Sequence, residues 1–217
     1  MDSQSPLRHI QIRSWNREYS QKGSLWHGPA HLDFEIPQGA RVLELGCGNG
    51  KTLSALLKAD CRITAIDASM RAVEMCKKLA HENGRDDVCL LVADTCSLPF
   101  PPETFDAVLA SHVLEHLLEE DRKIAVSEIK RVLKKRGRVF VKVFSTADMR
   151  FGKGKEIEKN TFLRGPNRLA YHYFTEDELR TLFSDFTEIS MRHIQFDKKY
   201  GDSVFVRHKI LGVWEKR

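Results

Sequence analysis

The strongest constraint on the fold is a short apolar strand that runs directly into a cluster of glycines. Residues Arg41–Leu45 read RVLEL, and Gly46, Gly48 and Gly50 follow at alternate positions. Glycine lets the chain turn sharply and lets backbone N–H groups come close to a ligand. The segment therefore predicts a ligand-binding loop at the carboxyl end of a buried strand.

Three classes of ligand are bound by glycine loops of this kind, and two of their patterns fail here. The dinucleotide pattern G-x-G-x-x-G requires its third glycine where the sequence has Lys51 or Leu53. The P-loop pattern requires a glycine at the position of Leu45, although Gly50-Lys51-Thr52 supplies its second half. Glu44 also disfavours a polyphosphate, because a carboxylate at the end of the strand repels phosphate groups. The pattern that remains is E-x-G-x-G-x-G.

Short apolar runs alternate with segments of helical periodicity in the first two thirds of the chain. We expect strands at residues 41–45, 62–66, 88–93, 105–110 and 138–144, and helices at 52–59, 69–83 and about 117–133. This alternation predicts a parallel sheet that is covered by helices on both faces.

The pattern changes after Ser145. Residues 145–174 are polar and basic and contain a Gly165-Pro166 turn, so we expect a long loop or an excursion from the sheet there. A capping box that begins at Thr175 predicts a helix to about Phe183. Two further strands are expected near residues 187–195 and 203–214.

Acidic residues end three consecutive expected strands, as Glu44, Asp67 and Asp94. The carboxyl ends of parallel strands meet at one edge of a sheet, where ligands bind. A carboxylate at such a place can accept two hydrogen bonds from ribose hydroxyl groups. A single aspartate at a strand end is often only a helix cap, but three of them along one edge favour a ligand site.

With these motifs in order, the segment from Arg41 to Phe144 resembles the class I S-adenosylmethionine-dependent methyltransferases. The resemblance implies an α/β, Rossmann-like, doubly wound fold with a seven-stranded, mostly parallel sheet whose last strand is antiparallel. It implies an enzyme that binds S-adenosylmethionine and releases S-adenosylhomocysteine. A catalytically silent cofactor-binding protein and a P-loop-type nucleotide-binding protein are the alternatives.

The resemblance also implies roles for individual residues. Asp67, with Ala68 beside it, is expected to bind the ribose hydroxyl groups. Asp94 is expected to bind the adenine amino group, and the backbone of Thr95 the edge of the adenine ring. Ser111 and His112 follow the fourth strand, where the methionine end of the cofactor meets the acceptor. The remaining cofactor-binding positions lie in the glycine loop, namely Glu44, Leu45, Gly46, Cys47, Gly48 and Gly50.

We expect one domain over residues 1–217, because no repeat or low-complexity linker divides the chain. Residues 1–40 are interpreted as a lid or appendage, and residues 41–144 as the cofactor-binding core. Residues 145–217 are interpreted as the acceptor side, with a loop, a helix and the terminal strands.

Residues His112–His116 spell H-x-x-E-H, a pattern of some zinc proteases. On a helix the two histidines would share one face, but the segment follows a buried strand and the sequence supplies no third ligand. We therefore expect no metal. His116 is the candidate general base, since histidine titrates near neutral pH; the alternative is a histidine that only packs on the next helix.

Aromatic residues precede the core as Trp15, Tyr19 and Trp26. Aromatic residues in such a segment often only pack against the rest of the fold. Their spacing, however, is similar to the N-terminal segment of several small methyltransferases, including protein-lysine methyltransferases that act on elongation factors. In those relatives the segment folds over the cofactor, and aromatic faces attract a sulfonium cation. We expect these three residues to form a cofactor lid.

We place the methyl acceptor at the basic segment Arg150–Tyr173, which contains Lys153, Lys155, Lys159, Arg164 and Arg168. Positive charge with aromatic residues suits an anionic small molecule or RNA, and the alternative is a solvated loop. A small molecule is the first expectation for the acceptor, a protein side chain the second and tRNA the third.

Composition sets the remaining expectations. The charge of +5 (35 basic against 30 acidic residues) does not by itself indicate a nucleic-acid protein. No apolar run approaches the roughly 20 residues of a membrane helix, and the first residues lack a secretory pattern. The five cysteines include no C-x-x-C pair, which favours free thiols in the cytoplasm over disulfides or zinc.

Overall fold

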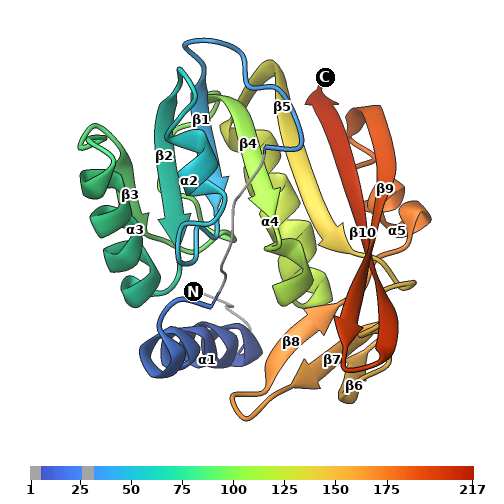
Figure 1. Ribbon diagram of the computed structural model, residues 1–217. Helices are drawn as coiled ribbons and strands as arrows, with labels where there is room; N and C mark the ends of the chain where they lie inside the picture. Colours follow the sequence, from blue (N-terminus) through green and yellow to red (C-terminus); the bar gives the residue numbers. More distant parts are fainter. Residues whose placement is uncertain (1–5, 26–31) are drawn as a thin grey trace.

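The computed structural model describes residues 6–25 and 32–217. A seven-stranded sheet in the order β3-β2-β1-β4-β5-β10-β9 forms its centre. The strands are β1 (Arg41–Leu45), β2 (Arg62–Asp67), β3 (Cys89–Val92), β4 (Phe105–Ser111), β5 (Leu133–Phe144), β9 (Phe186–Tyr200) and β10 (Ser203–Lys216). Strands β1 to β5 are mutually parallel, and β10 is antiparallel to both β5 and β9. The number of strands, their mostly parallel arrangement and the antiparallel last strand are as predicted (Figure 1).

Helices cover both faces of this sheet. The helices are α1 (Pro6–Lys22), α2 (Leu53–Leu56), α3 (Met70–Glu82), α4 (Glu119–Val132) and α5 (Glu176–Leu182), with a 3₁₀ turn, η1, at Leu114–His116. One core cluster joins β1 side chains such as Val42 to α2 and α3. The other joins Leu43 and Leu45 to α4 and α5. Alternate residues of β1 therefore face opposite helical layers, as expected for a strand buried on both sides.

The cap and stop signals at α3 lie where the sequence predicts them. The Ser69 side chain accepts a hydrogen bond from the Ala72 N–H at the start of the helix. Asn83 ends the helix, and Gly84 follows with a φ of +67°. No helix of the described residues is long and apolar enough to cross a membrane.

Of the two alternatives for residues 145–174, the long loop is wrong and the excursion is structured. A three-stranded antiparallel sheet occupies most of it, formed by β6 (Lys155–Glu158), β7 (Thr161–Arg164) and β8 (Leu169–His172). The Gly165-Pro166 turn joins β7 to β8 as a hairpin, and Thr161 and Ala170 of this sheet are fully buried. Figure 1 shows this sheet and α1 at the end of the main sheet toward which the parallel strands point.

The expected boundary between the long helix and the fifth strand is also wrong. Helix α4 ends at Val132 and β5 begins at once with Leu133, which pairs with Phe105. The ladder then shifts register and resumes at Arg138 opposite Ala107, so residues 134–137 bulge out of the strand. Gly137 lies inside β5 and does not separate helix from strand.

Candidate functional site

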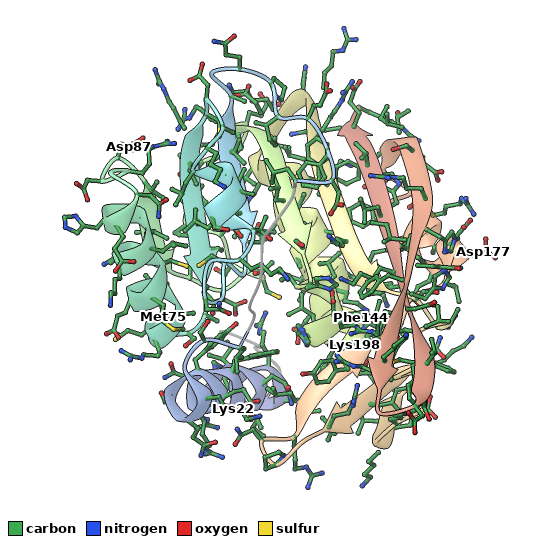
Figure 2. The ribbon with its side chains drawn as sticks, viewed as in Figure 1. Lys22, Met75, Asp87, Phe144, Asp177 and Lys198 are labelled. Atoms are coloured by element: carbon green, nitrogen blue, oxygen red, sulfur yellow. The ribbon has the colours of Figure 1, made fainter. Side chains whose placement is uncertain are left out.

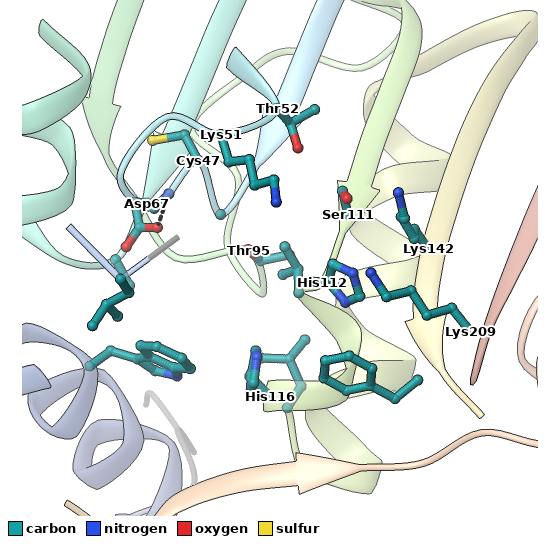
Figure 3. Close-up of a pocket in the computed structure, with 18 of the residues that line it drawn as sticks. Cys47, Lys51, Thr52, Asp67, Thr95, Ser111, His112, His116, Lys142 and Lys209 are labelled. Atoms are coloured by element: carbon teal, nitrogen blue, oxygen red, sulfur yellow. Dashed lines mark hydrogen bonds between the residues drawn. The ribbon is translucent and has the colours of Figure 1, made fainter. Parts of the chain in front are cut away.

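A cavity of about 770 Å³ lies at the carboxyl ends of the parallel strands. Its walls come from α1, the glycine loop, the segments that follow β2, β3 and β4, and the ends of β5, β9 and β10. Figure 3 shows side chains from these elements pointing into one space. The volume is in the range of sites that enclose small organic ligands, about 300–1,000 Å³.

The glycine loop forms one wall of the cavity through Gly46, Cys47 and Gly48. Gly48 has a φ of +55°, and a Cβ atom there would lie 2.6 Å from the hydroxyl oxygen of Tyr19. A side chain at this position would have to displace the Tyr19 hydroxyl group, and glycine avoids that shift. Leu45 is buried at the end of β1, and Gly50 packs against Leu79 of α3; neither of them lines the cavity.

Asp67 ends β2 and holds the glycine loop in place. Its Oδ2 accepts a hydrogen bond from the Gly48 N–H at 2.9 Å, and its Oδ1 accepts one from the Ser69 N–H at 2.8 Å. Burial raises the pKa of the Asp67 carboxyl to about 6, against the effect of these two donors. The side chain lines the cavity, as does its neighbour Ala68.

Glu44 does not face the cavity, in contrast to the expected row of three ligand-facing carboxylates. Its side chain is 2% exposed and lies on the α2 side of β1, where the Leu53 N–H donates a hydrogen bond to it. Burial and the nearby Asp67 raise its pKa to about 8, so Glu44 is neutral at pH 7. It supports the start of α2 and adds no charge to the site.

Asp94 and Thr95 follow β3 and line the cavity together. Asp94 accepts a hydrogen bond from the Cys96 N–H at 2.8 Å. Its other oxygen lies 3.6 Å from Nε of Arg8, whose Nη1 is 3.5 Å from Asp121. These ion pairs fasten the first turn of α1 to the edge of the sheet.

Helix α1 crosses the cavity and is held at several points. The Ser69 hydroxyl donates to the side-chain oxygen of Asn16 at 2.7 Å, which ties the middle of the helix to the start of α3. Trp15 and Tyr19 line the cavity, and the Trp15 ring lies edge-on to His116 with centroids 4.6 Å apart. Trp26, the third expected lid residue, lies outside the described residues.

Ser111 ends β4, His112 and His116 follow the strand, and all three line the cavity. The two histidines do not share a helix, because only the short turn η1 forms there and His112 precedes it with a φ of +60°. Nδ1 of His112 lies 2.5 Å from Oε1 of the buried Glu115, whereas Nδ1–H of His116 donates to the Ala170 carbonyl at 2.8 Å. In the described part of the chain, no group of three or more His, Cys, Asp or Glu side chains could hold a metal ion.

Burial sets the protonation of His112, His116 and Glu115. It lowers the pKa of His116 to about 4 and raises the pKa of Glu115 to about 8. The pKa of His112 is well below its usual range, first through burial and then through the neighbouring cations Lys209 and Lys142. At pH 7 all three groups are neutral.

The expected acceptor segment contributes little to the cavity. Of the basic residues between Arg150 and Tyr173, only Arg150 lines it. Tyr171 packs edge-on against His116, with centroids 4.8 Å apart. The wall opposite the glycine loop comes instead from β5, β9 and β10, through Lys142, Phe144, Phe196, Lys198, Arg207 and Lys209. Figure 2 shows Phe144 and Lys198 at this end of the sheet.

Sequence reasoning missed this wall, although a signal for it exists. Lys142 interrupts the apolar run of β5, and Lys209 lies next to the apolar pair Ile210-Leu211 of β10. A lone lysine in a buried strand is costly unless it serves a ligand or an ion pair.

Comparison with known proteins agrees with this architecture. A family model described as "Methyltransferase domain" matches residues 43–141. The tRNA N(3)-cytidine methyltransferase METTL2 of Gallus gallus is 30% identical over 162 residues, which are 66% of this chain and 41% of that protein. The chain thus spans about two fifths of the length of this relative.

Two crystal structures share the fold. An S-adenosylmethionine-dependent methyltransferase of Methanosarcina mazei superposes with a TM-score of 0.72 at 22% identity, over 85% of this chain and 99% of that one. The 1,6-didemethyltoxoflavin-N1-methyltransferase of Burkholderia thailandensis, with bound S-adenosylhomocysteine, has a TM-score of 0.61 at 19% identity, over 97% and 81% of the two chains.

Proposed function

Because the chain belongs to the class I S-adenosylmethionine-dependent methyltransferases, we propose that it transfers a methyl group from this cofactor to a small-molecule acceptor. The observation that carries the proposal is the cavity itself. It joins the glycine loop, two strand-end carboxylates, the α1 aromatic residues and His116 around one volume.

The residues of one half of the cavity fit the cofactor. Asp67 retains free lone pairs for ribose hydroxyl groups beyond its two backbone donors. Asp94 and Thr95 offer an acceptor and a backbone for the adenine edge. Gly48 brings the backbone close enough for the methionine part, with Ser111 across from it. Leu45, Gly50 and Glu44 act indirectly in this assignment, by shaping the loop.

S-adenosylmethionine, when bound, supplies a methyl group on a positively charged sulfur. The protein's contribution is to align the acceptor with this group and to exclude water. Trp15 and Tyr19 line the α1 side of the cavity and offer aromatic faces to the positive charge.

His116 is the proposed proton acceptor. The hydrogen bond from its Nδ1–H to the Ala170 carbonyl fixes the tautomer and leaves a lone pair on Nε2. Its low pKa keeps the ring neutral, so Nε2 orients the acceptor's hydroxyl or amine proton and receives it as the bond to the methyl group forms. A packing role alone would not require the ring to line the cavity.

A tRNA acceptor is the second candidate, favoured by the similarity to a tRNA methyltransferase. A protein side chain is the third. The position of α1 along one wall of the cavity favours a small molecule over both, because the helix narrows the space for a macromolecule. We also propose a cytoplasmic location, which the five unpaired cysteines support.

Two measurements test the proposal. Calorimetry with S-adenosylhomocysteine should show binding, and its absence would overturn the cofactor assignment. The protein should then be incubated with methyl-labelled S-adenosylmethionine and cell extract, and the extract separated into small molecules, protein and RNA. Label in the small-molecule fraction is expected. Label only in RNA or protein would replace the acceptor, and cofactor binding without any labelling would indicate a catalytically silent protein.

A further inference from the structure

The cavity is electrically polarised along its length. The half assigned to the cofactor carries three acids, Asp67, Asp94 and Asp121, with Arg8 as their cation. The opposite half carries one acid, Asp33, and six basic residues, namely Lys51, Lys142, Arg150, Lys198, Arg207 and Lys209. Such a concentration of one sign in a recess attracts ligands of the opposite sign.

Lys142 and Lys209 stand at the centre of the basic half. Lys142 lies on β5 and pairs with Leu211, and Lys209 lies on the adjacent β10 and pairs with Phe144. The two lysines are therefore diagonal neighbours on the same face of the sheet, within reach of one another's ammonium groups. Figure 3 shows both side chains, and Lys51 from the glycine loop, pointing into the space beside His112 and Ser111.

Carboxylates of the described residues pair with some of these cations. Lys142 forms an ion pair with Asp33, and Arg207 donates from Nε to Asp148 at 2.7 Å. Lys209 forms no ion pair with a carboxylate of the described residues, and its ammonium group lies over the Phe196 ring, 5.4 Å from the centroid. It is nevertheless half-buried, where an unpaired charge is costly. Burial and the neighbouring cations lower its pKa to about 8, so it remains charged at pH 7.

His112 lies at the same place. Its Nδ1 contacts Glu115, so Nε2 is the ring nitrogen that remains for a ligand. The basic half thus presents the ammonium groups of Lys142 and Lys209 beside this ring.

We propose that the methyl acceptor is a small organic anion whose carboxylate or phosphate group binds between Lys142 and Lys209, beside the imidazole ring of His112. The inference rests on the proposed function, because it places the acceptor in the half of the cavity opposite the cofactor. It names the class of the substrate and the residues that select it.

A small anion fits this place better than the backbone of RNA. The two lysines lie inside the cavity, flanked by Phe144 and Phe196. Lysines that follow a nucleic-acid backbone lie on an open surface. The exposed basic residues of the β6–β8 region are available for such contacts, but they do not line the cavity.

The test measures binding of simple anions to the protein saturated with S-adenosylhomocysteine. Calorimetric titrations use benzoate and phenyl phosphate as probes, with benzyl alcohol as a neutral probe of similar size. The variants are Lys209→Met and Lys142→Met, which keep most of the apolar stem. The control is Lys199→Met, which removes an exposed lysine of β9 that does not line the cavity.

We expect at least one of the two anions to bind and benzyl alcohol not to bind. Each cavity variant should weaken the anion at least tenfold, and the control should leave it unchanged. Equal anion affinity in Lys209→Met, Lys142→Met and the wild type would overturn the proposal, as would failure of both anions to bind. Binding of bulk tRNA that is insensitive to both variants, without anion binding, would replace it with an RNA acceptor.

Affinity for S-adenosylhomocysteine serves as the internal reference. The affinity for S-adenosylhomocysteine should be the same in the wild type and the three variants. This result would show that each variant is folded, and it tests the cofactor assignment independently of the acceptor site. Absence of S-adenosylhomocysteine binding in the wild type would defeat the proposed function. If the variants bind S-adenosylhomocysteine normally and bind the anions as well as the wild type does, only the assignment of the acceptor as an anion is overturned.

The pH dependence supplies a second measurement. Lys209 faces Lys142 on β5, Arg207 on its own strand, Lys51 in the glycine loop and Glu115 after β4. Above a pH of about 8, Lys209 loses its proton and Glu115 becomes charged. Both changes make the site more negative, so benzoate should bind more weakly at pH 9 than at pH 7. A stronger or constant affinity would contradict the proposed site.

Discussion

The buried carboxyl group of Glu44 should make the protein less stable as the pH rises, and Glu44→Gln should remove that dependence. The folded state raises the pKa of Glu44 from 4.5 to about 8. Between these values the folded protein keeps a proton that the unfolded chain has released. The free energy of unfolding therefore falls with pH, by about 1.4 kcal/mol per unit for one proton. From pH 5 to pH 8 the loss is about 3 to 4 kcal/mol.

Glutamine preserves the size of the side chain and the oxygen that accepts the Leu53 N–H. One Glu44 oxygen has no partner among the described residues, so the new amide group carries a cost that does not change with pH. We therefore compare how steeply the free energy of unfolding falls with pH in the wild type and in Glu44→Gln. The cost of the amide group is the same at every pH, so it does not affect this slope.

Urea denaturation of the ligand-free protein at pH 5, 6, 7 and 8 provides the measurement. Asp67 and Glu115 also have raised pKa values, so the wild type and the variant both lose stability, and the difference between them isolates Glu44. Glu120→Gln, at an exposed position on α4, is the matched control and should follow the wild type. Equal slopes for wild type and Glu44→Gln, within about 1 kcal/mol over the range, would show that Glu44 is ionised in the folded protein and would refute the reasoning.

Three further substitutions test the cavity. Gly48→Ala places a Cβ atom 2.6 Å from the Tyr19 hydroxyl oxygen and should weaken the binding of S-adenosylhomocysteine at least tenfold in calorimetry. The control is Gly84→Ala, which has a similar φ of +67° but no atom within 4 Å of the added Cβ atom. It should leave the affinity for S-adenosylhomocysteine unchanged. His116→Ala should reduce methyl transfer in the labelling assay and keep cofactor affinity, and unaltered turnover would remove its catalytic role. Trp15→Ala should weaken cofactor binding, since it opens the α1 side of the cavity; an unchanged dissociation constant would contradict the lid.

The main sheet could be predicted from the sequence because its central strands are buried on both faces. Strand β1 has the predicted bounds, and β2 and β4 each extend only one residue further. Buried parallel strands are nearly continuous in apolar residues, and glycine and polar residues mark their ends. The β6–β8 sheet lacks that signal. Its strands have four residues each, and β6 is largely exposed.

The chemistry of the site could be predicted less completely. The positions of Asp67 and Asp94 follow from strand ends, which the sequence shows. The orientation of Glu44 depends on which face of β1 it occupies, and alternation with Leu43 and Leu45 places it beneath α2. The role of Lys209 depends on pairing between strands that are far apart in the chain. The apolar neighbours of Lys209 mark it in the sequence, but its partner strand is a property of the tertiary fold.

The hairpin of β9 and β10 extends past the main sheet. Strand β10 pairs with β5 only from Lys209 to Glu215, while its pairing with β9 continues to Ser203. Phe196 and Lys198 reach the cavity from this outer part of the ribbon. Residues there can be exchanged without disturbing the central packing that holds the glycine loop. Selectivity for the molecule to be modified can therefore diverge between related proteins, or be redesigned, while the apparatus for the methyl donor stays intact.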